Sequence, residues 1–365
     1  MPQRRPPHPW RNLPCTADEL FEFTGALLCG DMDAVIRKLS APDSVVGLLV
    51  DRHRLGPLLA TRESDAAWTS RLATATKDRI RATHQRQEMA AERCLTLLDA
   101  IDAECRIEEA LPFLVVKGPA MALRCYGGIA ARGYWDLDIM IAEGDRVRME
   151  SLLERIDAFR LSRTLLSGSV SARFNHAFDY ERDGVKLDLH WSFSRLPGVR
   201  CDGAGALARG ESLNLSGRTV RVLAPADELH FVLVSAFADI QRGYVRMQTF
   251  IDAWELIRRI SPSDWPAFFA ARKGERTEHI CRETLRVMLA SLRIGDAVPE
   301  LVEALGGCPT TQVARQLMLP SPAGIRGKRW ASHALPVALP RYAVWWCVSL
   351  PFRVAASHPA WRRRR

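Results

Sequence analysis

LPFLVVKGPAMALRCYGGIAARGYWDLDIMI, residues Leu111 to Ile141, is the stretch that decides the fold of this 365-residue chain. It opens with a short apolar run, residues 111–116, that stops at Lys117-Gly118. Branched apolar residues in so short a run, bounded by a glycine, predict a buried strand. Pro119 favours the first turn of a following helix, and the double glycine at 127–128 is typical of a helix end.

This order of strand, turn and helix suggests a binding site for phosphate. The first N–H groups of a helix have no partner within the helix, and the helix dipole makes that end positive. A phosphate group is therefore favoured at the turn, where Lys117 and the Gly118 N–H would contact it.

Two aspartates follow on the next predicted strand, Trp135–Ile141. Along a strand, alternate side chains point to opposite faces, so Leu137, Ile139 and Ile141 share one face and Asp136 and Asp138 the other. Two carboxylates about 7 Å apart repel each other unless a cation lies between them, and Mg²⁺ prefers such oxygen ligands. An isolated Asp-x-Asp is more often an ordinary strand with a solvated acidic face.

A third carboxylate stands in a matching setting. Tyr180–Trp191 reads YERDGVKLDLHW, which predicts a hairpin with a tight turn at Asp183-Gly184. Its second strand directs Leu187 and Leu189 to one face and Asp188 and His190 to the other. Asp188 would join the Asp-x-Asp pair if the two strands were neighbours.

The order Lys-Gly, Arg132, Asp-x-Asp, Asp-Leu-His-Trp resembles the bacterial uncharacterised nucleotidyltransferase family of the DNA polymerase β-like superfamily. The resemblance is strongest from about residue 95 to 191 and extends to about 259. It implies an α+β fold: a small mixed sheet of nucleotidyltransferase type that carries three aspartates, with helical regions before and after it. One departure is the phosphate turn, where the superfamily usually has Gly-Ser and this chain has Lys117-Gly118-Pro119.

The resemblance also implies an activity and roles. The expected reaction moves a nucleoside monophosphate from an NTP to an unidentified acceptor (small molecule, peptide or protein) with Mg²⁺ or Mn²⁺. The catalytic and metal-binding residues are then Asp136, Asp138 and Asp188. The nucleotide-binding residues are Lys117, Gly118, Arg132 and His190.

Two other functions stay open from the sequence. The same scaffold could be a catalytically inactive module that binds a nucleotide or a partner. Alternatively, the C-terminal tail could bind nucleic acid. His230 and Asp252 resemble positions that recur in the helical part of the family, and polar contacts between helices explain them equally well.

The net charge of +9 comes from the C-terminal tail. Residues 304–365 contain ten Lys or Arg and no Asp or Glu, so subtracting ten from +9 leaves −1 for residues 1–303. The tail mixes tryptophans and prolines and ends in Arg362–Arg365, which suggests contact with an anionic membrane or a polyanion. A helix capping the domain, followed by a frayed end, is the alternative.

Composition limits the class of protein. Nine cysteines without a Cys-x-x-Cys pair argue against a disulfide framework and favour a reducing, cytoplasmic location. No run of about 18 apolar residues occurs, so the sequence predicts no membrane-spanning segment.

We expect four regions along the chain: an N-terminal helical region (1–94), a catalytic core (95–224), a C-terminal helical region (225–319) and the basic tail (320–365). The helix predictions include a capping box at Thr16–Glu19, a long helix over Ala66–Ala103, one over Asp145–Ile156 and one over Val245–Ile260. One further strand is expected at Arg218–Leu223.

Overall fold

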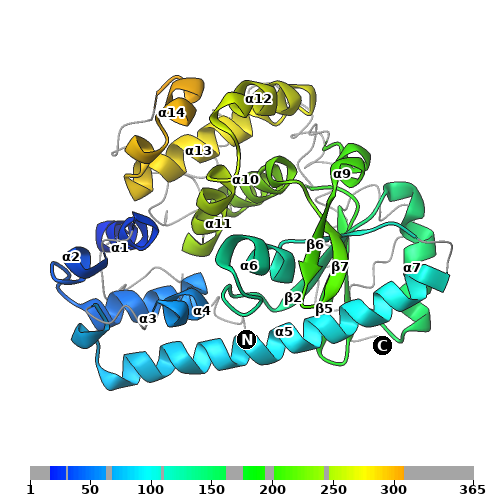
Figure 1. Cartoon of the computed structure of the whole chain (residues 1–365), viewed down its shortest axis with the longest axis horizontal. Helices are drawn as coiled ribbons and strands as arrows, with labels where there is room; N and C mark the ends of the chain where they lie inside the picture. Colours follow the sequence, from blue (N-terminus) through cyan, green and yellow to red (C-terminus); the bar gives the residue numbers. More distant parts are fainter. Residues whose placement is uncertain are drawn as a thin grey trace, which may run out of the picture.

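The computed structural model describes residues 17–29, 32–62, 68–107, 111–161, 176–193, 201–241 and 246–307. Its centre is one mixed sheet with strand order β3-β4-β5-β2-β1-β7-β6 (Figure 1). The strands are β1 Leu114–Val116, β2 Asp136–Met140, β3 Phe159–Arg160, β4 Ala177–Arg182, β5 Val185–His190, β6 Glu211–Leu215 and β7 Arg218–Val222. The pairs β2–β5 and β1–β7 are parallel, and the other neighbours are antiparallel. The predicted α+β fold with a mixed sheet is confirmed.

Two hairpins form where the backbone turns with positive φ. The predicted turn at Asp183-Gly184 has φ values of 51° and 75°, as a tight two-residue hairpin requires. Ser216-Gly217 repeats this geometry between β6 and β7, with φ values of 53° and 86°. The sequence predicted β7 but not β6, because Glu211–Leu215 is short and exposes most of its side chains, so that only Leu213 and Leu215 mark its inward face.

The helices lie before, between and after the strands. Their bounds are α1 Ala17–Cys29, α2 Met32–Ile36, α3 Pro42–His53, α4 Gly56–Thr61, α5 Thr74–Ile107, α6 Gly118–Tyr126, α7 Arg146–Arg155, α9 Gly203–Arg209, α10 Pro225–Gln241, α11 Met247–Ile257, α12 Trp265–Gly274, α13 Glu278–Leu292 and α14 Pro299–Leu305. The helix predicted from Ala66 begins later: a 3₁₀ turn at Trp68–Arg71 precedes α5, with Trp68 buried. Thr16 of the predicted capping box and the basic tail lie outside the described residues.

The 34-residue helix α5 connects two hydrophobic cores (Figure 1). Ile80, near its start, belongs to a core built from the helices. Residues from Ala91 to Cys105 pack with α7 on the apolar face of the sheet, against Leu137, Ile139 and their neighbours. The predicted boundary at 94/95 therefore falls inside a continuous helix, near the point where it passes from one core to the other.

The N-terminal and C-terminal helices share the first of these cores. Side chains of α1, α3 and α4 cluster with those of α10, α11, α13 and α14, and Met121 and Cys125 of α6 join them. The two helical regions, more than 100 residues apart in sequence, are thus one packed layer beside the sheet.

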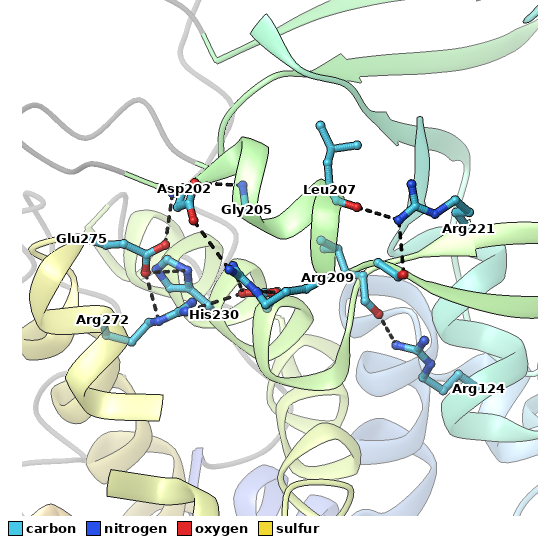
Figure 2. A network of polar contacts seen from close by, with 12 residues as sticks. Arg124, Asp202, Gly205, Leu207, Arg209, Arg221, His230, Arg272 and Glu275 are labelled. Carbon is cyan, nitrogen blue, oxygen red and sulfur yellow. Dashed lines mark hydrogen bonds and ion pairs between the residues drawn. The ribbon is translucent and has the colours of Figure 1, made fainter. Parts of the chain in front are cut away.

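A partly buried ion-pair network fastens α9, which follows the hairpin strands, to this helical layer (Figure 2). Arg209 donates to both carboxylate oxygens of Asp227 at 2.8 and 3.0 Å, and Arg272 approaches Asp227 at 3.5 Å. Glu275 pairs with Arg272 at 2.9 Å and accepts the Asp202 N–H at 3.1 Å. Because their charges are mutually compensated, Asp227, Arg272 and Glu275 can be buried at the contact between helices.

Within the part of the chain that the structure describes, no helix combines the length and the apolar character needed to cross a membrane.

The close contact of α1 with α13 depends on Gly25. A Cβ atom built at Gly25 would lie 2.5 Å from the backbone oxygen of Leu292, which cannot rotate away. We therefore expect Gly25→Ala to lower the free energy of unfolding by about 1–3 kcal/mol, measured by urea denaturation.

Gly47 in α3 is the matched control. Its Cβ would meet only the mobile end of Arg79, at 3.5 Å, so Gly47→Ala should be neutral or stabilise by about 0.5–1 kcal/mol. Equal effects of the two substitutions would contradict the helix packing described above.

Candidate active site

The register of two parallel strands brings the predicted carboxylates together. In the β2–β5 pair, Asp138 lies opposite Asp188, and Asp136 lies opposite Lys186. Leu137 and Ile139 point to the apolar core on the other face, as the alternation predicted. The condition that the sequence left open, that these two strands be neighbours, is met.

His190 lies directly against Asp138. Its Nε2 is 2.8 Å from Asp138 Oδ1, and both side chains are buried. Ligand atoms of Asp138, Asp188 and His190 all lie within 4.8 Å of one another. The histidine is therefore placed to orient the Asp138 carboxylate, and its predicted contact with a nucleotide stays a prediction.

Two more carboxylates border this group. Asp136 lies two residues before Asp138 on the same strand face and is half-buried. Asp179, which the sequence analysis did not identify, stands opposite Asp188 in the β4–β5 pair. The signal was present, because Phe178 and Tyr180 on either side of Asp179 point to the apolar core and so direct it to the acidic face.

The proximity of these charges separates the pKa values of the two central aspartates. Burial works to raise the pKa of Asp138, but the nearby Lys117 ammonium and the hydrogen bond with His190 outweigh it and hold the pKa below its usual value. Burial raises the pKa of Asp188 to about 8, and the charges of Asp138, Asp136 and Asp179 add to that effect. Without a cation, a proton on Asp188 relieves the repulsion.

The donor set fits a hard divalent cation. Carboxylate oxygens are the ligands that Mg²⁺ prefers, and Mn²⁺ also accepts an imidazole nitrogen. Burial and the charges of Asp138, Asp136 and Asp179 raise the pKa of Asp188, and a bound cation would neutralise that negative charge.

The predicted phosphate turn lies beside the carboxylates, with Lys117 in an unusual backbone conformation. Lys117 has φ 50° and ψ −135°, in the region that favours glycine, and α6 begins at the next residue. A Cβ at Gly118 would meet the backbone oxygen of Asp136 at 3.4 Å, so the turn packs closely on β2. The Lys117 N–H donates to Glu228 at 3.1 Å, a contact between segments 111 residues apart.

The Lys117 ammonium is held on the acidic face of the sheet. Its Nζ lies 3.8 Å from the centre of the Phe231 ring, a cation–π contact, and Phe231 packs edge-on against His190. The Lys117 charge helps to hold the pKa of Asp138 below the usual value and opposes part of the rise in the pKa of Asp188 that burial and the neighbouring carboxylates cause. The side chain of Lys117 therefore extends from the predicted phosphate turn toward the carboxylates.

Arg132 has a protein partner in the structure. Its Nε and Nη2 donate to the two carboxylate oxygens of Asp252 at 2.9 and 2.7 Å, and the Tyr126 hydroxyl donates to the same carboxylate at 2.5 Å. Asp252 thus ties α11 to the loop before β2. A phosphate contact from Arg132 stays a prediction, and it would have to use the remaining donors of the guanidinium group.

His230 lies in the ion-pair network described above, next to Glu275 (Figure 2). Its Nδ1 is 3.6 Å from Glu275, too long for a hydrogen bond, and burial together with the Arg272 charge lowers its pKa. Phe193 packs against His230 on one side and Phe231 on the other. Contact between helices is the explanation that fits this position.

The part of the chain that carries this site matches a known protein family. The family described as "Uncharacterised nucleotidyltransferase" matches residues 46–290, about two thirds of the chain. No curated protein matches.

Three solved structures are similar in part. The solution structure of the antibiotic-resistance factor ANT(2'')-Ia is 17% identical over 50% of this chain and 92% of that one, with a TM-score of 0.37. A crystal structure of ANT(2'')-Ia in complex with adenylyl-2''-tobramycin is 17% identical over 49% of this chain and 96% of that one, with a TM-score of 0.37. An antigenic nucleotidyltransferase-like protein from Paracoccidioides brasiliensis is 16% identical over 61% of this chain and 93% of that one, with a TM-score of 0.33.

The pKa of Asp188 leads to a prediction about stability and pH. Because its pKa is raised from 3.8 to about 8 in the folded protein, folding binds a proton between these values and stability falls as pH rises through that window. Asp188→Asn cannot ionise. In EDTA at pH 9 we expect it to melt a few degrees above the unsubstituted protein, with the difference vanishing near pH 4.

The control is Asp183→Asn, at an exposed hairpin position with positive φ that asparagine also tolerates. It should change neither the melting temperature nor its pH dependence. A lower melting temperature for Asp188→Asn than for the unsubstituted protein at pH 9 would contradict the repulsion between Asp188 and the neighbouring carboxylates.

Proposed function

The chain belongs to the uncharacterised nucleotidyltransferase family, and from this we propose that it transfers a nucleoside monophosphate from an NTP to an acceptor in a reaction that depends on Mg²⁺ or Mn²⁺. The acceptor is a small molecule, a peptide or a protein. The observation that supports the proposal most strongly is the pairing of Asp138 with Asp188 in register on adjacent strands, beside a helix that begins at a Lys-Gly turn.

The chemistry requires charge stabilisation and alignment. An acceptor oxygen attacks the α-phosphorus, the bond to the bridging oxygen breaks, and pyrophosphate leaves with that electron pair. A bound divalent cation would supply Lewis-acid stabilisation of the negative charge on the phosphate oxygens. Asp136, Asp138 and Asp188 would hold the cation.

The protein's own groups have distinct roles in this proposal. Lys117 and the Gly118 N–H bind the β- and γ-phosphates at the start of α6. His190 orients Asp138 through the 2.8 Å contact. Asp188 accepts the proton that the acceptor hydroxyl loses. Arg132 contributes to phosphate binding through donors that Asp252 does not use.

Turnover of Asp138→Asn tests the proposal. Asparagine keeps the size of the side chain but removes a charged ligand, so NTP turnover should fall by orders of magnitude. The measurement is release of pyrophosphate from each of the four NTPs with Mg²⁺ or Mn²⁺, against sugars, phosphorylated sugars, peptides and proteins as acceptors. Asp183→Asn is the control and should keep full turnover. Undiminished turnover in Asp138→Asn would refute the mechanism.

The role of Lys117 can be separated from the strain in its backbone. Lys117→Ala removes the ammonium group and keeps a side chain at φ 50°, whereas Lys117→Gly removes both the charge and the strain. Both should weaken NTP binding by about 1.5–3 kcal/mol, measured by titration with a fluorescent NTP.

The two variants should differ in stability, with Lys117→Gly the more stable by about 1 kcal/mol. NTP affinity equal to that of the unsubstituted protein in both variants would show that the lysine does not contact phosphate.

A further inference from the structure

Glu228, in the first turn of α10, is a buried carboxylate that holds both ends of helix α6. Its side chain is 1% exposed. Its Oε1 accepts the Lys117 N–H at 3.1 Å, and its Oε2 accepts from Arg124 Nη1 at 3.2 Å. Lys117 directly precedes α6 and Arg124 lies in the last turn of this nine-residue helix. One side chain from the C-terminal helices therefore fixes the helix that starts at the phosphate turn.

The backbone of Lys117 is held at both of its polar groups. Its carbonyl oxygen accepts the Met121 N–H at 2.9 Å, which is the first hydrogen bond of α6, and its N–H donates to Glu228. With φ 50° and ψ −135°, Lys117 lies in a region that favours glycine. Such a conformation persists where the surrounding contacts enforce it. The hydrogen bond to Glu228 is one of these contacts.

The same contact decides which groups the turn presents to a phosphate. The first N–H groups of a helix have no partner within the helix. The Lys117 N–H is taken by Glu228, and Pro119 has no N–H. The Gly118 N–H and the Lys117 ammonium are the groups to which the proposed function assigns phosphate, and both depend on the direction that the Lys117 backbone gives them.

A carboxylate next to a phosphate site would repel the ligand unless its charge were balanced. Arg124 balances it, with a side chain that is 11% exposed and also donates to the Leu223 carbonyl at 2.5 Å and to Glu211 at 3.1 Å. Burial raises the pKa of Glu228 to about 7, and the charge of Arg124 and the Lys117 N–H oppose part of that rise. At pH 8 Glu228 is therefore mostly ionised and paired.

We propose that Glu228 is a positioning residue for the donor nucleotide, which holds the turn so that the Gly118 N–H and the Lys117 ammonium meet the NTP phosphates. The proposal rests on the nucleotidyl-transfer function above and adds a residue of the C-terminal helices to its NTP site. Glu228 acts through the backbone of Lys117 and not by contact with the phosphates.

Two substitutions separate the hydrogen bond from the charge. Glu228→Gln keeps an oxygen within reach of the Lys117 N–H and removes the charge opposite Arg124. Glu228→Asp keeps the charge and is one methylene shorter, which withdraws the acceptor from the Lys117 N–H. We expect Glu228→Asp to weaken NTP binding by about tenfold and Glu228→Gln to change it by less than about threefold. The measurement is titration with a fluorescent NTP in Mg²⁺ at pH 8.

The Lys117→Gly background tests whether Glu228 acts on the backbone conformation. Glycine adopts a positive φ without strain, so the turn then depends less on the contact with Glu228. Adding Glu228→Asp in this background should weaken NTP binding by less than about threefold, in contrast to about tenfold in the unsubstituted protein. Equal losses in the two backgrounds would contradict an action through the Lys117 backbone.

Two controls distinguish positioning from a general effect on the structure. Glu211→Gln removes the half-exposed partner of Arg124 and should leave NTP binding unchanged. Mn²⁺ binding without NTP, followed by electron paramagnetic resonance, should be the same in every variant, because none of them alters a carboxylate on the acidic face of the sheet.

Three results would overturn the proposal. The first is NTP binding by Glu228→Asp as tight as that of the unsubstituted protein. The second is an equal loss in Glu228→Gln, which would make the charge and not the hydrogen bond responsible, and this variant decides alone if Glu228→Asp does not fold. The third is a loss of Mn²⁺ binding together with NTP binding, which would assign Glu228 a structural role. Titration with NTP tests the turn and pyrophosphate release tests the transfer reaction, so failure of the two proposals can be told apart.

Discussion

The pairing of β2 with β5 in a register that puts Asp138 opposite Asp188 is the constraint on which this site depends. Two carboxylates in adjacent strands, with Asp136 and Asp179 next to them, are unfavourable in a partly buried setting. The fold keeps them there because five successive residue pairs of the two strands are in register and the opposite face is fully apolar. The repulsion is offset locally by Lys117, by His190 and by a proton on Asp188.

The helical layer supports the unusual backbone conformation of the turn at Lys117, where phosphate binding is proposed. Lys117 adopts a backbone conformation that is unfavourable for a side-chain-bearing residue, and Glu228 of α10 accepts its N–H. The same Glu228 also accepts from Arg124 of α6 at 3.2 Å. Asp252 of α11 holds the loop before β2 through Arg132 and Tyr126. The C-terminal helices therefore position the site, although they contribute no residue to the acidic cluster.

Opposite charges lie close together around the start of β2. The acidic face of the sheet suits a divalent cation, and Lys117 lies beside it, directly before the start of α6. A nucleotidyl transfer has to bring a polyanionic donor, a cation and an acceptor together without mutual repulsion. Lys117 places a positive charge next to the carboxylates of the sheet, which is compatible with that requirement.

The sequence by itself determined the strand-turn-helix unit at Lys117, the two-residue hairpin at Asp183-Gly184 and the acidic faces of β2 and β5, because alternation, glycine and proline act locally. It also contained the signal for Asp179, between two core aromatics. Tertiary structure alone decided which strands are neighbours, since pairing between residues 50 apart leaves no local trace. It likewise decided that the two helical regions form one core and that Arg132 pairs with Asp252. Those contacts follow from packing between distant segments, and no pattern within a single segment encodes them.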